Sequence, residues 1–207
     1  MKNKIVKVKN FTPKKILEKI KNPYFKNINN QSNLNFVIEI CKNLKINNNK
    51  ILKVVNSFKA LKYRQEIIYK NNHLLIMNDS KSTSFSSSLN ILQSYKNIFW
   101  IVGGLKKVGD QFNLSKIKKN ILKAFIIGKN RSFFKNKINK KIDYVETENI
   151  HKAVKNIFSE LKNFYKNKDK IFVILSPACA SYDQFKNFEE RGELFKKLIN
   201  YNAKKYL

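Results

Sequence analysis

Residues 171–175 read Ile-Phe-Val-Ile-Leu and run directly into Ser176-Pro177-Ala178-Cys179-Ala180-Ser181, a loop of small side chains. A short apolar run that ends in such a loop is typical of a strand buried inside a sheet. Further apolar runs occupy residues 98–102 and 124–127, and a short strand is expected at residues 143–145. Stretches with the apolar spacing of helices follow at 114–122, 132–138, 149–165 and from 182 to the end. This alternation predicts an α/β fold in which helices flank a mostly parallel sheet.

The residues before this region predict helices and one hairpin. Residues 66–69 and 73–77 flank Lys70-Asn71-Asn72, which indicates a β-hairpin. Apolar side chains recur at helical spacing in residues 31–43 and 48–58. Further upstream, Thr12 and Pro13 favour the start of a short helix that continues to about Lys21. We therefore expect a small helical segment ahead of the sheet, too thin to fold well alone.

The composition limits the classes of partner. The chain has 207 residues, of which 43% are hydrophobic, enough for one or two cores. A net charge of +29 suits a nucleic-acid binder, but the lysines are spread along the whole chain and only three arginines occur. Because phosphate and base recognition favours arginine, we expect no specific nucleic-acid partner. The chain contains no apolar run long enough for a membrane span, and its two cysteines fit a cytoplasmic location.

Loops with unusual sequences follow the predicted strands, and parallel sheets bind ligands beyond the carboxyl ends of their strands. The first loop is Asn-Asp-Ser-Lys-Ser-Thr (78–83), with a helix expected to start near Thr83. The N–H groups of that helix start, together with the Lys81 ammonium, suit a phosphate or a carboxylate. Asp79 suits a ribose or a metal ion. A capped turn with polar side chains in solvent explains the same residues.

The second loop, Gly-Gly-Leu-Lys-Lys (103–107), has glycines that permit close backbone approach and places Lys107 within reach of a bound anion. A plain turn after a strand is the alternative. In the third loop, Ser181 lies where the last helix is expected to begin. Cys179 also lies there, but the two histidines are in no recognisable Cys/His arrangement, so we interpret Cys179 as a structural thiol.

Taken in order, three sequences resemble the C-terminal region of the Mur ligase family. They are Asn-Asp-Ser-Lys-x-Thr (78–83), Gly-Gly-x-x-Lys (103–107) and Ser-Pro-Ala-Cys-Ala-Ser-x-Asp-Gln-Phe-Lys-Asn-Phe-Glu-x-Arg-Gly (176–192). The resemblance covers about residues 20–207. Within the family, these loops are most similar to those of the enzymes that add D-glutamate. The resemblance implies a Rossmann-like C-terminal domain at residues 65–207, preceded at residues 1–64 by a helical remnant of the central ATPase domain.

The resemblance implies an amide ligase of peptidoglycan precursor synthesis. In this family ATP phosphorylates the carboxylate of UDP-N-acetylmuramoyl-L-alanine, and the amine of D-glutamate attacks the acyl phosphate. The residues that match the D-glutamate contacts are Thr83, Lys107, Ser181 and Phe188. The residues that match the ATP contacts are Asn30, Asn33, Arg64, Asp79 and Lys81. Two departures weaken the match on the ATP side, since Asn29 and Tyr63 replace histidines of the family pattern.

Several parts of the complete enzyme are missing from this sequence. No Gly-x-x-x-x-Gly-Lys-[Ser/Thr] phosphate loop occurs, and neither the UDP-binding domain nor residues matching the Mg²⁺ ligands can be identified. We therefore assign no catalytic or metal-binding residue and expect the chain alone to be inactive. A separate chain could supply the missing domains. The alternatives are a non-catalytic part that binds D-glutamate or a nucleotide and, less favoured, a basic nucleic-acid-binding protein.

Overall fold

The computed structural model describes residues 14–26, 28–59, 61–164 and 170–206. The chain forms two compact units, Met1–Ala60 and Leu61–Leu207, and each is described by itself. This division falls ahead of the predicted boundary after residue 64, and the Tyr63 carbonyl accepts a hydrogen bond from Lys81 N–H within the second unit. None of the helices formed by the described residues is long and apolar enough to cross a membrane.

The first unit is helical, as predicted. It contains α1 (Lys14–Leu17), a 3-10 helix (Pro23–Lys26), α2 (Ile28–Asn43) and α3 (Asn48–Ser57). Asn47 caps α3 because its side-chain oxygen accepts the Asn49 N–H at 2.8 Å. The described core is small and consists of Ile16, Leu34, Ile38, Ile51 and Val55. The first predicted helix is too long, since α1 ends at Leu17; Thr12 and Pro13 lie outside the described residues.

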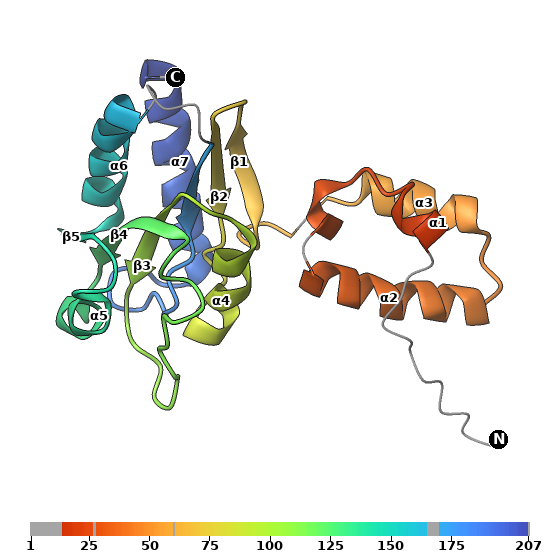
Figure 1. The fold of residues 1–207 in the computed structure, drawn as a ribbon, viewed down its shortest axis with the longest axis horizontal. Coiled ribbons are helices and arrows are strands. Elements are labelled where there is room, and N and C mark those ends of the chain that lie inside the picture. Colours follow the sequence, from red (N-terminus) through yellow and green to blue (C-terminus); the bar gives the residue numbers. More distant parts are fainter. Residues whose placement is uncertain (1–13, 27, 60, 165–169, 207) are drawn as a thin grey trace. The chain divides into compact units, whose positions relative to one another are not determined.

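The second unit is built on a six-stranded sheet with the order β1-β2-β6-β3-β4-β5 (Figure 1). Its strands are β1 (Glu66–Lys70), β2 (Leu74–Asn78), β3 (Ile98–Gly103), β4 (Ile121–Ile127), β5 (Tyr144–Glu148) and β6 (Ile171–Leu175). β1 and β2 form the predicted antiparallel hairpin, and every other pair of neighbours is parallel. The predicted mostly parallel α/β fold is therefore confirmed.

Helices cover both faces of this sheet (Figure 1). They are α4 (Phe85–Ser94), α5 (Arg131–Ile138), α6 (Ile150–Phe164) and α7 (Phe188–Tyr206). Side chains alternate between the faces along each strand. In β3, Trp100 packs in the cluster that includes α4 and α5 residues, whereas Phe99 and Ile101 pack with α6 and α7 residues. All six residues of β3 are buried, which explains its continuous apolar sequence.

Two of the predicted helices differ from the structure. Residues 115–120, expected inside a helix, form turns in which Leu114 O accepts N–H bonds from Ile117 and Lys118, and β4 begins at Ile121. Only Leu114 and Ile117 of this segment reach the core, too few to anchor a longer helix. The last helix begins at Phe188 rather than near Tyr182, because residues 181–187 fold into a separate loop.

Candidate ligand site at the carboxyl edge of the sheet

Three loops meet where β2, β3 and β6 end, and we name them the β2 loop (residues 79–84), the β3 loop (104–110) and the β6 loop (176–187). The strands are neighbours, with β6 between β2 and β3. Asp79 N–H donates to Leu175 O at 2.7 Å, and Gly103 N–H donates to Pro177 O at 2.9 Å. Leu105 and Ala180 exchange two backbone hydrogen bonds, at 3.0 and 3.2 Å. Backbone contacts thus join all three loops into one edge.

Asp79 lies inside this edge, with 3% of its surface exposed. Its carboxylate accepts hydrogen bonds from Gln65 N–H at 3.1 Å, from Ser176 Oγ at 2.9 Å and from Ser82 Oγ. Burial raises the pKa of Asp79 to about 6, although these hydrogen bonds and Arg64 act in the opposite direction. With these partners, the Asp79 carboxylate fastens the β2 loop to the β6 loop.

The β2 loop also brings an exposed ammonium group to the start of α7. Lys81 is exposed, and its Nζ lies 4.7 Å from the centroid of the Phe188 ring. Its N–H donates to Tyr63 O at 2.9 Å, in a turn where Tyr63 adopts φ 61°. Arg64 is exposed in the same turn. The structure therefore brings Arg64, Asp79, Lys81 and Phe188 together, with two cations accessible to an anion.

The β3 loop passes directly over the β6 loop. Gly104 has φ +132°, and a Cβ atom there would collide with the carbonyl oxygen of Ala180. Glycine is therefore required for this approach. Lys107 is exposed and lines a small pocket that Cys179 also lines. Asp110, three residues after Lys107 in the same loop, accepts the N–H of Phe85, the first residue of α4. This contact brings the β3 loop to the start of α4, two residues after exposed Thr83.

Ser181 lies in a tight turn and not at a helix start. Its carbonyl accepts N–H bonds from Gln184 at 3.1 Å and Phe185 at 2.9 Å, and only 3% of its surface is exposed. The expectation that α7 begins here is wrong because this turn ends before Phe188. Cys179 is 1% exposed, and burial raises the pKa of its thiol to about 12, which agrees with a structural role.

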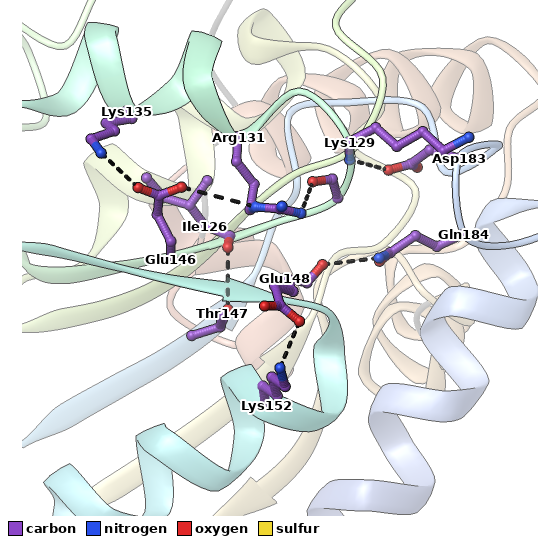
Figure 2. Close-up of polar contacts among 11 residues, drawn as sticks. Ile126, Lys129, Arg131, Lys135, Glu146, Thr147, Glu148, Lys152, Asp183 and Gln184 are labelled. Atoms are coloured by element: carbon purple, nitrogen blue, oxygen red, sulfur yellow. Dashed lines mark hydrogen bonds and ion pairs between the residues drawn. The ribbon is translucent and has the colours of Figure 1, made fainter.

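The far side of the β6 loop is fastened to the ends of β4 and β5 (Figure 2). Asp183 Oδ2 accepts Lys129 N–H at 2.8 Å, and Gln184 Nε2 donates to Glu148 O at 2.9 Å. Gly128 adopts φ +82°, and a Cβ atom there would lie 2.5 Å from Asp183 Oδ2. Asp183 and Gln184 therefore hold the loop in place.

Asn30 and Asn33 belong to α2 of the first unit. Asn30 is buried, with 6% of its surface exposed, and its amide nitrogen donates to Tyr24 O at 2.8 Å. Asn33 is exposed. Across the described parts of both units, no three His, Cys, Asp or Glu side chains form a cluster that could hold a metal ion.

Four residues that hold the loops had no predicted role: Asp183, Gln184, Ser176 and Arg191. For Arg191, the sequence contains a pattern that could have indicated a role. Phe195 and Ile199 form the buried stripe of α7, and Arg191 precedes Phe195 by four residues, so it falls on the same stripe. A charged residue on an apolar stripe is an unusual finding that points to a specific set of partners.

The relatives found by sequence comparison that are described below carry the same protein name. The chain is 43% identical over 166 residues to a UDP-N-acetylmuramoylalanine–D-glutamate ligase from Wolbachia sp. subsp. Brugia malayi, covering 80% of this chain and 33% of that ligase. It is 33% identical over 181 residues to the ligase of that name from Rickettsia conorii, covering 86% of this chain and 36% of the relative. No family profile matches. The chain thus spans about a third of the length of these relatives.

Solved structures agree on the fold. MurF from Acinetobacter baumannii superposes with a TM-score of 0.55 at 13% identity, over 83% of this chain and 38% of MurF. A pseudomurein peptide ligase type C from Methanothermus fervidus gives 0.54 at 19% identity, over 88% of this chain and 37% of that chain. The resemblance inferred from the three loops is confirmed: the chain is a homologue, over about four fifths of its length, of part of the UDP-N-acetylmuramoylalanine–D-glutamate ligases of the Mur ligase family.

Proposed function

We propose that this chain is the D-glutamate-binding part of an ATP-dependent ligase that adds D-glutamate to UDP-N-acetylmuramoyl-L-alanine in peptidoglycan precursor synthesis. The observation that carries the proposal is the convergence of the three loops on one sheet edge, in a homologue of ligases with that name. Residues 65–207 would be the C-terminal domain of such an enzyme, and residues 1–64 the end of its central domain.

The edge offers groups that suit a dicarboxylic amino acid. Lys107 presents an exposed ammonium group on the β3 loop, and the β6 loop at Ser181 offers a second point of contact, so the two carboxylates of the amino acid can be held separately. Thr83, Ser181 and Phe188 complete the proposed D-glutamate contacts. In the complete ligase, the amine of D-glutamate would form the new C–N bond at an acyl phosphate, and inorganic phosphate would leave. The residues of this chain would bind and orient the amino acid.

Arg64 and Lys81 are the proposed ATP contacts beside the β2 loop, and the assignment of Asn30 and Asn33 of the first unit to ATP stays a prediction from the resemblance. Asp79 would support this site by positioning the loop, because all its described partners are within the protein. Mg²⁺ would act in the complete ligase; the described residues form no cluster of three or more His, Cys, Asp or Glu side chains, and Mg²⁺ usually takes one or two carboxylates together with substrate phosphates. The 207 residues also contain no phosphate loop, so turnover would need a further segment or a separate chain that carries it.

A titration of the full 207-residue chain tests the amino-acid site. D-Glutamate added to isotope-labelled protein should shift the NMR signals of the three loops. Because a charge-assisted hydrogen bond contributes about 1.5–3 kcal/mol, Lys107→Ala should weaken binding roughly 10- to 100-fold. Lys119→Ala is the matched control, since Lys119 is equally exposed but lies outside the three loops. Equal affinity of the wild type and Lys107→Ala would remove Lys107 from the site.

A reconstitution tests the assignment as part of a ligase. The chain should form no D-glutamate amide from ATP by itself, because phosphoryl transfer depends on a phosphate loop and its metal ions. Addition of a chain carrying the missing domains of the Wolbachia relative should restore ADP-linked amide formation. D-Glutamate binding without restoration would favour a non-catalytic binding part, and turnover by the chain alone would contradict the predicted inactivity.

A further inference from the structure

Arg191 is a buried cation whose described partners are all uncharged. It lies in the first turn of α7, with 1% of its surface exposed. Its Nε donates to Ser80 Oγ at 2.9 Å, and its Nη2 donates to Ser80 O at 2.8 Å. Its Nη1 donates to Cys179 O at 3.1 Å. One guanidinium group therefore holds the β2 loop and the β6 loop in a fixed relation.

Further hydrogen bonds strengthen the same junction. Ser80 Oγ donates to Phe188 O at 2.8 Å, and Asn78 Nδ2 donates to Gly192 O at 3.0 Å. A Cβ atom at Gly192 would collide with the Tyr63 ring, so the helix can approach only with glycine at this position. The position of Phe188, and with it the contact to Lys81, depends on this junction.

The cost of burying a charged guanidinium indicates that Arg191 contributes geometry and charge rather than stability. Burial lowers the pKa of its guanidinium to about 10, which leaves the group charged at neutral pH. A buried charge without a counter-ion is costly, and apolar residues often replace buried ionic groups without loss of stability. Among the ion pairs of the described residues, none includes Arg191. Its positive charge, which the Asp183 carboxylate favours from beyond ion-pair distance, lies next to two loops that the proposed function assigns to anionic ligands.

We propose that Arg191 is a positioning residue that couples the nucleotide side of the edge, the β2 loop, to the amino-acid side, the β6 loop. This inference rests on the proposed function. Because the planar guanidinium donates to both loops at once, an anion that orders one loop also stabilises the other. Lysine at this position keeps the charge but cannot reproduce the three bonds, so it uncouples the loops.

Hydrogen–deuterium exchange of the full chain, read by mass spectrometry, tests the coupling. In Arg191→Lys the amides of both loops should exchange at least about tenfold faster, while those of β4 stay unchanged. Added ATP, whose proposed contacts include Lys81 of the β2 loop and no residue of the β6 loop, should slow exchange in both loops of the wild type but only in the β2 loop of the variant. Arg131→Lys is the control, since the Arg131 guanidinium donates to Gly128 O at 2.8 Å and lies 3.9 Å from Glu146, and neither partner belongs to the β2 loop or the β6 loop.

Arg191→Met removes both the charge and the three hydrogen bonds, so its comparison with Arg191→Lys isolates the contribution of the charge, and Trp100 fluorescence shows whether each variant is folded. Unchanged exchange in both loops of folded Arg191→Lys would overturn the proposal, as would ATP protection that still reaches the β6 loop of this variant. If ATP protects neither loop of the wild type, the proposed nucleotide site is wrong. Loop exchange without ligand still decides whether Arg191 holds the two loops together.

Discussion

Gly128→Ala should destabilise the second unit because the added Cβ atom would collide with its neighbours, whereas the Cβ atom of Gly109→Ala would meet none. Gly128 adopts φ +82°, and a Cβ atom there would lie 2.5 Å from Asp183 Oδ2 and 2.7 Å from the Cα atom of Gly104. Gly109 adopts a similar φ of +78°, but nothing lies within 4 Å of its Cβ position. The two substitutions therefore impose the same backbone strain and differ in crowding.

The expected magnitudes follow from that comparison. Alanine in the left-handed region costs about 1–2 kcal/mol, which is the whole effect expected for Gly109→Ala. At Gly128, overpacking adds about 1–3 kcal/mol. Displacement of the Asp183 carboxylate from Lys129 N–H adds about 1 kcal/mol more. Gly128→Ala should therefore lower the free energy of unfolding by about 3–6 kcal/mol in total.

Urea unfolding followed by tryptophan fluorescence measures this difference in the second unit alone. Trp100 is the single tryptophan, and it is fully buried in β3. The midpoint for Gly128→Ala should lie well below that for Gly109→Ala, with similar slopes. Because Asp183 holds the β6 loop, D-glutamate binding by the folded Gly128→Ala protein should also weaken. Equal midpoints for the two variants would refute the packing around Asp183.

Three further measurements test other features. The pKa of Asp79 in the fold, about 6, lies above its ordinary 3.8; the folded state therefore binds this proton more tightly, so stability should fall by about 3 kcal/mol as pH rises from about 3 to about 7. Urea unfolding of Asp79→Asn should lack this decrease, and its persistence would exclude Asp79 as the cause. Buried Cys179 should react with iodoacetamide at least about tenfold more slowly than half-buried Cys41 in the folded protein, by mass spectrometry, and equal rates would contradict its burial. DNA binding through the charge of +29 should weaken steeply with salt and be insensitive to Lys107→Ala, whereas tight binding at physiological salt would favour a nucleic-acid partner.

β3 and β6 were predictable because their apolar residues are continuous. β3 and β6 lie inside the sheet with helices on both faces, so nearly every residue is apolar and the runs are visible without periodicity. The turns at 115–120 were not predictable in the same way. Leu114 and Ile117 are three residues apart, a spacing that a single turn shares with a longer helix, and only tertiary packing distinguishes the two.

The candidate site was partly predictable. The loop sequences indicated which residues gather at the carboxyl edge, because parallel strands end on the same side. The insertion of β6 between β2 and β3, which joins the loops, is a long-range pairing that no local pattern encodes. The internal partners of Asp79 and the three bonds of Arg191 depend on that insertion, so their positioning roles became visible only in the structure.

The central position of β6 also matters during synthesis on the ribosome. β6 is the last strand to be translated, yet it separates β2 from β3 in the finished sheet. Until residue 175 has emerged, the nascent chain can form only the β1–β2 hairpin and the β3–β4–β5 ribbon, each with an unpaired edge. Unpaired edges invite wrong pairing and aggregation. Translation that stalls before β6 would therefore leave two incomplete sheets, a state that chaperones would have to protect.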